Sequence, residues 1–104
     1  MYSRVTLLEI DTLRTDVDEA VEEYETRFLP HLRELPGYEG VAVMVTSEGK
    51  GMVVTFWDSE EAVEASAGFA TSIVEKFVTL YRSPPGREHY RVAYAEMPRV
   101  TVES

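Results

Sequence analysis

Apolar and polar positions recur with two different periods along the first third of this chain, and each period predicts an element. Residues 5–10 are apolar on both faces, as is typical of a strand that is covered on both sides. Residues 17–35 instead place apolar side chains at helical spacing, which predicts an amphipathic helix with an acidic outer face. These apolar positions are Val17, Ala20, Val21, Tyr24, Phe28, Leu32 and Leu35.

The predicted helix carries signals for its start, its interior and its end. Thr15 followed by Asp18 resembles a capping box and predicts the start. Pro30 lies inside the pattern, where it cannot donate to the carbonyl of Thr26 and its ring crowds that group. We therefore expect a kink or break over residues 27–29, and an end at Leu35, which precedes the turn residues Pro36 and Gly37.

The middle of the chain predicts a hairpin and a second helix. Residues 41–46 and 51–57 read as strands joined by a turn at 47–50, with Gly49 free to adopt positive φ. Asp58, with Glu61 three positions on, is the expected N-cap of the helix that follows, and Gly68 is a point of interruption. Its apolar stripe consists of Ala62, Val63, Ala67, Ala70, Ile73, Val74, Phe77 and Tyr81.

The last part of the chain predicts a loop, a strand and a tail. The sequence SPPG at 83–86 favours an exit loop, and alternation over 88–97 indicates a final strand. Residues 1–97 are expected to form a single domain and 98–104 a C-terminal tail. The resulting β-α-β-β-α-β order matches the ferredoxin-like α+β fold, with one antiparallel four-stranded sheet and two helices on one face. Because the other face also looks apolar, we expect a homodimer that covers it.

Charge and composition narrow the possible partners. The formal net charge is −9, which argues against nucleic acid as a ligand. No apolar run is long enough for a membrane span, and charges occupy the positions of a signal peptide's apolar region, so a cytoplasmic protein without membrane contact is expected. The absence of cysteine excludes disulfides and thiolate metal sites. No metal-binding or phosphate-binding motif is present, and we expect neither metal nor cofactor.

Two motifs resemble a known family. Pro36-Gly37-Tyr38 leads into the second strand, and the sequence WDSEEA at 57–62 leads into the second helix. Over roughly residues 2–97 the chain resembles antibiotic biosynthesis monooxygenase-like domains of the dimeric α+β barrel superfamily. The resemblance implies that two sheets face each other across a homodimer, with a small-molecule pocket between the sheet and the helices. Its members include cofactor-independent oxygenases of aromatic, polyketide-like substrates.

The resemblance also extends to haem-degrading members, which share a tryptophan at the position of Trp57. Those proteins use an asparagine on the first strand, a second tryptophan and a histidine on the second helix. This chain has Thr6-Leu7, Ser66 and no histidine at the corresponding positions, so haem degradation by that route is not expected. A haem ligand would have to come from His31 or His89.

The candidate site residues are one base and a set of aromatic side chains. His31 is the candidate catalytic base, and His89 is expected at an edge or in a dimer contact. The predicted substrate-binding residues are Tyr24, Phe28, Phe56, Trp57, Phe77 and Tyr81. A small core would need the same aromatic residues, and Trp57 is expected to pack first and to border a pocket second.

The leading hypothesis is a small-molecule-binding protein that can support cofactor-independent oxidation of an aromatic or polyketide-like ligand. The alternative is a non-catalytic homodimer that serves binding or assembly. A pocket bordered by His31 or by a tyrosine hydroxyl favours the first hypothesis, whereas a pocket filled by aromatic side chains favours the second.

Overall fold

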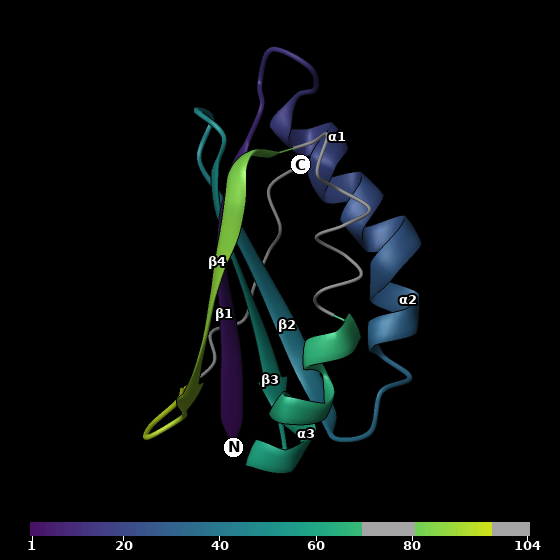
Figure 1. Ribbon diagram of the computed structural model, residues 1–104, viewed down its shortest axis with the longest axis vertical. Coiled ribbons are helices and arrows are strands. Elements are labelled where there is room, and N and C mark those ends of the chain that lie inside the picture. Colours follow the sequence, from purple (N-terminus) through teal and green to yellow (C-terminus); the bar gives the residue numbers. More distant parts are fainter. Residues whose placement is uncertain (70–80, 97–104) are drawn as a thin grey trace.

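The computed structural model describes residues 1–69 and 81–96, with the backbone alone for 81–89, and shows one antiparallel sheet with helices along one face (Figure 1). The strands are β1 (Tyr2–Ile10), β2 (Tyr38–Val45), β3 (Lys50–Trp57) and β4 (Tyr81–Arg91). They lie in the order β2-β3-β1-β4, and each neighbouring pair is antiparallel. This arrangement confirms the ferredoxin-like α+β fold.

The first helical segment changes its geometry around the predicted break. Helix α1 (Val17–Glu23) continues into the π-helical turn η1 (Tyr24–Phe28) and then into α2 (Leu29–Leu32). The amide of Leu29 donates to the carbonyl of Tyr24, five residues back. Pro30 stands in the first turn of α2, where a missing amide hydrogen is tolerated. The helix is therefore irregular next to Pro30, but the irregularity is a wider turn over Tyr24–Phe28 that leaves the helical path continuous and not the break expected over 27–29.

Both predicted helix caps are wrong by one residue. Helix α1 is capped by Asp16, whose carboxylate accepts from the amide of Glu19 at 2.7 Å, and not by Thr15. Helix α3 (Glu60–Ala65) is capped by Ser59, whose hydroxyl accepts from the amide of Ala62 at 3.1 Å, and not by Asp58. Thr15 and Asp16, like Asp58 and Ser59, are all residue types that can cap a helix, so the residue at which the backbone enters the helix determines which one does.

Helix α3 is shorter than the predicted second helix. It ends before Ser66, and residues 67–69 are helical again, so the interruption falls at Ser66 and not at Gly68. The later positions of the predicted stripe, from Ala70 to Phe77, lie outside the described residues.

The β2–β3 hairpin confirms the predicted turn. Gly49 has a φ of +96°, and the amide of Thr46 donates to the carbonyl of Lys50 at 2.8 Å. Strand β2 begins at Tyr38, three residues earlier than predicted, directly after Gly37 with a φ of +83°. The carbonyl of Gly37 accepts from the amide of Asp58 at 2.9 Å, so this turn fixes the start of β2 beside the end of β3.

Strand β4 corrects the prediction for the end of the chain. It begins at Tyr81, which pairs with Ile10, and it includes the SPPG sequence that was expected to form a loop. The register shifts between Leu7 and Glu9, opposite the two prolines, and β4 is an edge strand. A bulge on an edge strand accommodates residues without an amide hydrogen. The strand ends at Arg91, and residues 92–96 form no regular element, so the predicted strand over 88–97 is wrong in both bounds.

The sheet has one covered and one uncovered face in the described part of the chain. Trp57, Val63, Ala62, Leu29 and Leu32 form the buried core between sheet and helices. Alternation along the strands directs Val5, Leu7, Val54 and Phe56 to the other face. Leu7 is 49% exposed and Met44, also on that face, is 51% exposed, so large apolar side chains there face solvent in the single chain.

Candidate functional site

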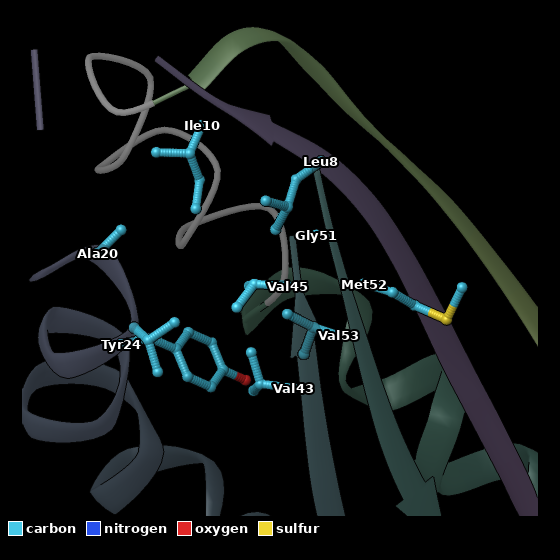
Figure 2. A pocket seen from close by; sticks show the side chains of 10 residues that line it. Leu8, Ile10, Ala20, Tyr24, Val43, Val45, Gly51, Met52 and Val53 are labelled. Carbon is cyan, nitrogen blue, oxygen red and sulfur yellow. The ribbon is translucent and has the colours of Figure 1, made fainter. Parts of the chain in front are cut away.

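A small apolar cavity lies between α1 and the sheet. Its volume is about 30 Å³, and Figure 2 shows the side chains around it. Strands β1, β2 and β3, helix α1 and the start of η1 supply its lining, which consists of Leu8, Ile10, Ala20, Val21, Tyr24, Val43, Val45, Gly51, Met52 and Val53. In Figure 2 the side chain of Met52 points away from the others, as its place on the opposite side of β3 requires.

Tyr24 gives the cavity its polar feature. Among the described residues that line the cavity, it is the one whose side chain carries a hydroxyl group. Figure 2 shows the Tyr24 hydroxyl beside Val43 on β2. The ring also stacks on Phe28, with ring centroids 6.4 Å apart and an interplanar angle of 27°. Phe28 is buried, so this contact fixes the direction of the Tyr24 ring.

The spacing of the lining residues on α1 explains why this side of the helix borders the cavity. Ala20, Val21 and Tyr24 lie on one helical face, and the small side chain of Ala20 leaves room beside the sheet. On β3, Gly51 also leaves room: a Cβ atom there would stand 2.7 Å from Leu8 Cδ1. The cavity therefore depends on two small residues placed opposite larger ones.

A wider groove adjoins the cavity where α1 begins. It has a volume of about 430 Å³ and is lined by Thr12, Asp16, Val17, Asp18, Val45, Thr46 and Ser47. Val45 belongs to both linings, and Val17 precedes Ala20 by one helical turn. Ligand pockets usually hold about 300–1,000 Å³, so the groove has the size of a ligand site and the cavity alone does not.

Trp57 is a core residue, as the sequence predicted first. It is 1% exposed, its indole nitrogen donates to the hydroxyl of Thr55 at 2.9 Å, and its ring meets Tyr38 edge-on at 5.9 Å between centroids. It is not among the residues that line the cavity. Its second predicted role, as a pocket wall, therefore has no support from the cavity described above.

The remaining predicted site residues do not gather at the cavity. Phe56 lies on the uncovered face of the sheet, because it alternates with the inward-facing Trp57. His31 is exposed on α2 and does not line the cavity. Tyr81 was expected on a helix but belongs to β4, and Phe77 lies outside the described residues. Catalysis by His31 stays a prediction without a described partner group.

Sequence reasoning missed most of the cavity, because its lining is mostly aliphatic and comes from five elements. Leu8, Val43, Val45 and Val53 look like ordinary strand residues, and only their register brings them together. Gly51, which follows the turn glycine Gly49, was the one feature of the sequence that could have indicated the cavity. A glycine inside a strand often marks a point of close approach.

Arg4 is a second polar feature on the helix-facing side of the sheet. Its Nη2 donates to the carbonyl of Val63 at 2.8 Å, and its Nε donates to the hydroxyl of Ser66 at 3.4 Å. These groups belong to the end of α3, where free carbonyls and the helix dipole favour a cation. The contacts hold the Arg4 guanidinium against the last turn of α3.

Metal and membrane features can be judged only for the part of the chain that the structure describes. Within residues 1–69 and 81–96, no group of three or more histidine or acidic residues is placed to hold a metal ion. In the same ranges, no helix is long and apolar enough to cross a membrane.

Comparison with solved structures places the fold in a known class. A monooxygenase of Streptomyces coelicolor, ActVA-Orf6, solved in complex with nanaomycin D, aligns with a TM-score of 0.73 at 19% identity over 94% of this chain and 92% of that chain. A protein of unknown function from Nitrosomonas europaea aligns with the same TM-score at 18% identity over 95% of both chains. The heme-degrader MhuD of Mycobacterium tuberculosis, solved with two hemes bound, aligns with a TM-score of 0.67 at 17% identity over 93% of this chain and 100% of that chain.

These likenesses show the fold. No family model and no curated protein sequence matches the chain. The chain has the fold of the antibiotic biosynthesis monooxygenase-like structures, as its sequence resemblance predicted. Because one fold can carry different chemistries, function has to be argued from the cavity and its surroundings.

Proposed function

We propose that this chain binds a small apolar or aromatic molecule in the cavity and groove between α1 and the sheet. The observation that carries the proposal is the aliphatic cavity with the Tyr24 hydroxyl on its wall. An apolar lining with one oriented polar group is the usual composition of a small-molecule site. Two solved structures of this fold, ActVA-Orf6 and MhuD, contain nanaomycin D and heme, which supports a ligand site in such a fold.

The reaction we propose for this site is oxidation of a phenolic or enolic ligand by O₂ without a bound cofactor. A ring methylene carbon becomes a carbonyl, one atom of O₂ is retained, and the other leaves as water with the two methylene hydrogens. The substrate supplies all four electrons, so the reaction needs no other reductant. Tyr24 would donate a hydrogen bond to the oxyanion that forms when the substrate loses a proton, and the aliphatic wall would exclude water.

The cavity also supports this hypothesis over a domain that serves assembly alone. A cavity filled by aromatic side chains would have favoured the assembly role, whereas the described cavity is bordered by a tyrosine hydroxyl. The ligand would occupy the groove with its apolar end against the cavity lining, because about 30 Å³ accommodates only one or two water molecules.

A binding experiment with 2-naphthol tests the site. We expect saturable binding by isothermal titration calorimetry, and a loss of about tenfold in affinity in Val43→Phe, which fills the space beside Tyr24. Tyr38→Phe is the matched control, because Tyr38 packs on Trp57 away from the cavity. Equal affinity in Val43→Phe and the parent protein would place the ligand elsewhere.

Oxygen uptake with anthrone-like compounds tests the reaction separately. We expect protein-dependent uptake that falls in Tyr24→Phe, with the product carrying one labelled atom from ¹⁸O₂. His31→Ala distinguishes the two candidate residues, because His31 is exposed outside the cavity. Loss of uptake in His31→Ala with full uptake in Tyr24→Phe would transfer the catalytic role to His31, and absence of uptake from every compound would leave binding alone.

We also propose that the uncovered face of the sheet pairs with a second copy of the chain. Leu7, Met44 and Tyr90 on that face are each about half exposed, and Val54 and Phe56 lie among them. An apolar area of this kind is costly in water, and self-association would cover it. Sedimentation equilibrium tests the proposal: a dimer is expected for the parent protein and a monomer for Val54→Glu, whereas a monomeric parent protein at micromolar concentration rejects it.

The division into one domain over 1–97 and a tail over 98–104 stays a prediction, since 97–104 lie outside the described residues.

The cytoplasmic location predicted from the sequence also stays part of the proposal. Fractionation of cells that express a tagged chain would test that location.

A further inference from the structure

The groove beside α1 has a polar lining, whereas the cavity that adjoins it is mostly apolar. Five of the seven residues that line the groove carry side-chain oxygen atoms, namely Thr12, Asp16, Asp18, Thr46 and Ser47. The other two are Val17 and Val45, and Val45 also lines the cavity. A ligand that occupies both places therefore meets an apolar surface at one end and oxygen atoms at the other.

Two connections at one end of the sheet hold the walls of the groove. The segment between β1 and α1 supplies one wall, and the β2–β3 turn supplies Thr46 and Ser47 (Figure 1). The amide of Ile10 donates to the carbonyl of Gly49 at 2.7 Å, which ties the end of β1 to this turn. The hydroxyl of Thr46 accepts from the amide of Lys50 at 3.2 Å. These contacts fix the walls before a ligand binds, which lowers the entropic cost of binding.

The groove offers more hydrogen-bond acceptors than donors. The carboxylates of Asp16 and Asp18 only accept, and Asp16 uses one of its two oxygens for the amide of Glu19. Among the described residues that line the groove, none is basic. Arg14, in the neighbouring turn, lies outside the lining and contacts Asp11 at 3.6 Å. The part of a ligand that lies in the groove must therefore donate hydrogen bonds.

This lining distinguishes between the polar groups that a ligand could carry. A carboxylate or phosphate would lie beside two carboxylates, and the formal net charge of −9 adds to the repulsion. An ammonium group is a compact charge and would fill only a small part of about 430 Å³. Several hydroxyl groups on one substituent can donate to the carboxylates and exchange hydrogen bonds with the threonine and serine hydroxyls. A neutral, hydroxyl-rich group therefore matches both the size and the chemistry of the groove.

We propose that the groove binds a neutral polyhydroxyl substituent, such as a sugar ring, carried by the apolar or aromatic ligand of the cavity. This inference rests on the proposed function and narrows its ligand class to aromatic glycosides and related polyols. Asp16 and Ala20 are four residues apart, which separates them by about 6 Å along the axis of α1. An aromatic ring beside Ala20 and a sugar attached directly to it can therefore occupy both places.

Three probes with the same naphthalene ring test the inference. We measure binding of 2-naphthol, 2-naphthyl β-D-glucoside and 2-naphthyl β-D-glucuronide at neutral pH by isothermal titration calorimetry. The glucuronide differs from the glucoside by a carboxylate in place of a hydroxymethyl group. We expect the glucoside to bind about tenfold more tightly than 2-naphthol, because its hydroxyls form charge-assisted bonds with the carboxylates. We expect it to bind about tenfold more tightly than the glucuronide, because the carboxylates repel the added charge.

A matched pair of variants tests the two carboxylates. Asp16→Asn/Asp18→Asn removes two charges and keeps a residue type that can cap α1. It should reduce both preferences to about threefold, because hydrogen bonds between neutral groups are weaker. Glu60→Gln/Glu61→Gln is the control, since it removes two charges from the first turn of α3, outside the groove. It should leave both preferences intact, and circular dichroism should show that both variants are folded.

The outcomes separate this inference from the proposed function. Equal affinity of the parent protein for the glucoside and 2-naphthol, or for the glucoside and the glucuronide, overturns the hydroxyl-binding groove and leaves apolar binding standing. An equal loss of preference in the control variant also overturns it, because net charge then explains the effect. Failure of all three probes to bind rejects the groove and the proposed function together.

Discussion

Trp57 and Thr55 are two residues apart on β3, and the indole nitrogen donates to the threonine hydroxyl at 2.9 Å within the buried core. Both side chains face the helices, because residues i and i+2 of a strand share a face. The bond satisfies an N–H group that would otherwise be buried without a partner. Thr55 therefore allows a tryptophan to be placed in the centre of a small core.

Replacement of Thr55 by valine keeps the shape of the side chain and removes this acceptor. We expect the free energy of unfolding to fall by about 1–3 kcal/mol, the usual effect of leaving a buried donor unpaired. Urea denaturation followed by tryptophan fluorescence measures it directly, because the chain has a single tryptophan. Thr6→Val on β1 is the control, and a loss at Thr6 as large as that at Thr55 would contradict the role of the bond.

Gly37 is predicted to be intolerant of any side chain. Its φ is +83°, and a Cβ atom there would stand 2.5 Å from the Cβ of Ala62 and 2.6 Å from Asp58 Oδ1. Gly37→Ala should lower the free energy of unfolding by more than about 1 kcal/mol, since both the backbone and the contacts are unfavourable. Gly40→Ala, whose nearest neighbour would be 3.9 Å away, should have a smaller effect in the same thermal melt. Equal losses at the two sites would be inconsistent with this geometry.

The N-cap of α3 can be assigned by mutation. Ser59 accepts from the amide of Ala62, so Ser59→Ala should lower the free energy of unfolding by about 1 kcal/mol. Asp58→Ala, at the position that the sequence pattern favours, should have the smaller effect because its carboxylate does not cap the helix. The two variants are compared by chemical denaturation, and a reversed order would restore Asp58 as the cap.

Gly51 is predicted to keep the cavity open. A Cβ atom there would meet Leu8 Cδ1 at 2.7 Å, and Leu8 lines the cavity, so its flexible end would be pushed toward that space. Gly51→Ala should therefore weaken 2-naphthol binding by about tenfold, while the chain remains folded. Gly68→Ala is the control, because a Cβ atom there has no neighbour within 4 Å. Unchanged affinity in Gly51→Ala would show that the ligand does not use this part of the cavity.

The sequence by itself determined the order of the elements and most of their character. The glycine of the hairpin turn and the helical spacing of apolar residues from Val17 to Leu32 are local properties, and each was read correctly. The burial of Trp57 in the core could also be predicted from its neighbours in the sequence, since a single large aromatic residue at the end of an apolar strand usually packs in the core.

Tertiary structure decided which residues strand pairing brings together and which of two neighbouring residues caps a helix. The strand register places Phe56 on the uncovered face and turns unremarkable residues such as Leu8 and Val43 into a cavity wall. The bulged edge of β4 includes a proline pair that local rules assign to a loop, because an edge strand can leave amide positions unpaired. The register pair of Arg4 and His89 likewise arises only when β4 lies beside β1, since no spacing within the sequence places these two residues opposite each other.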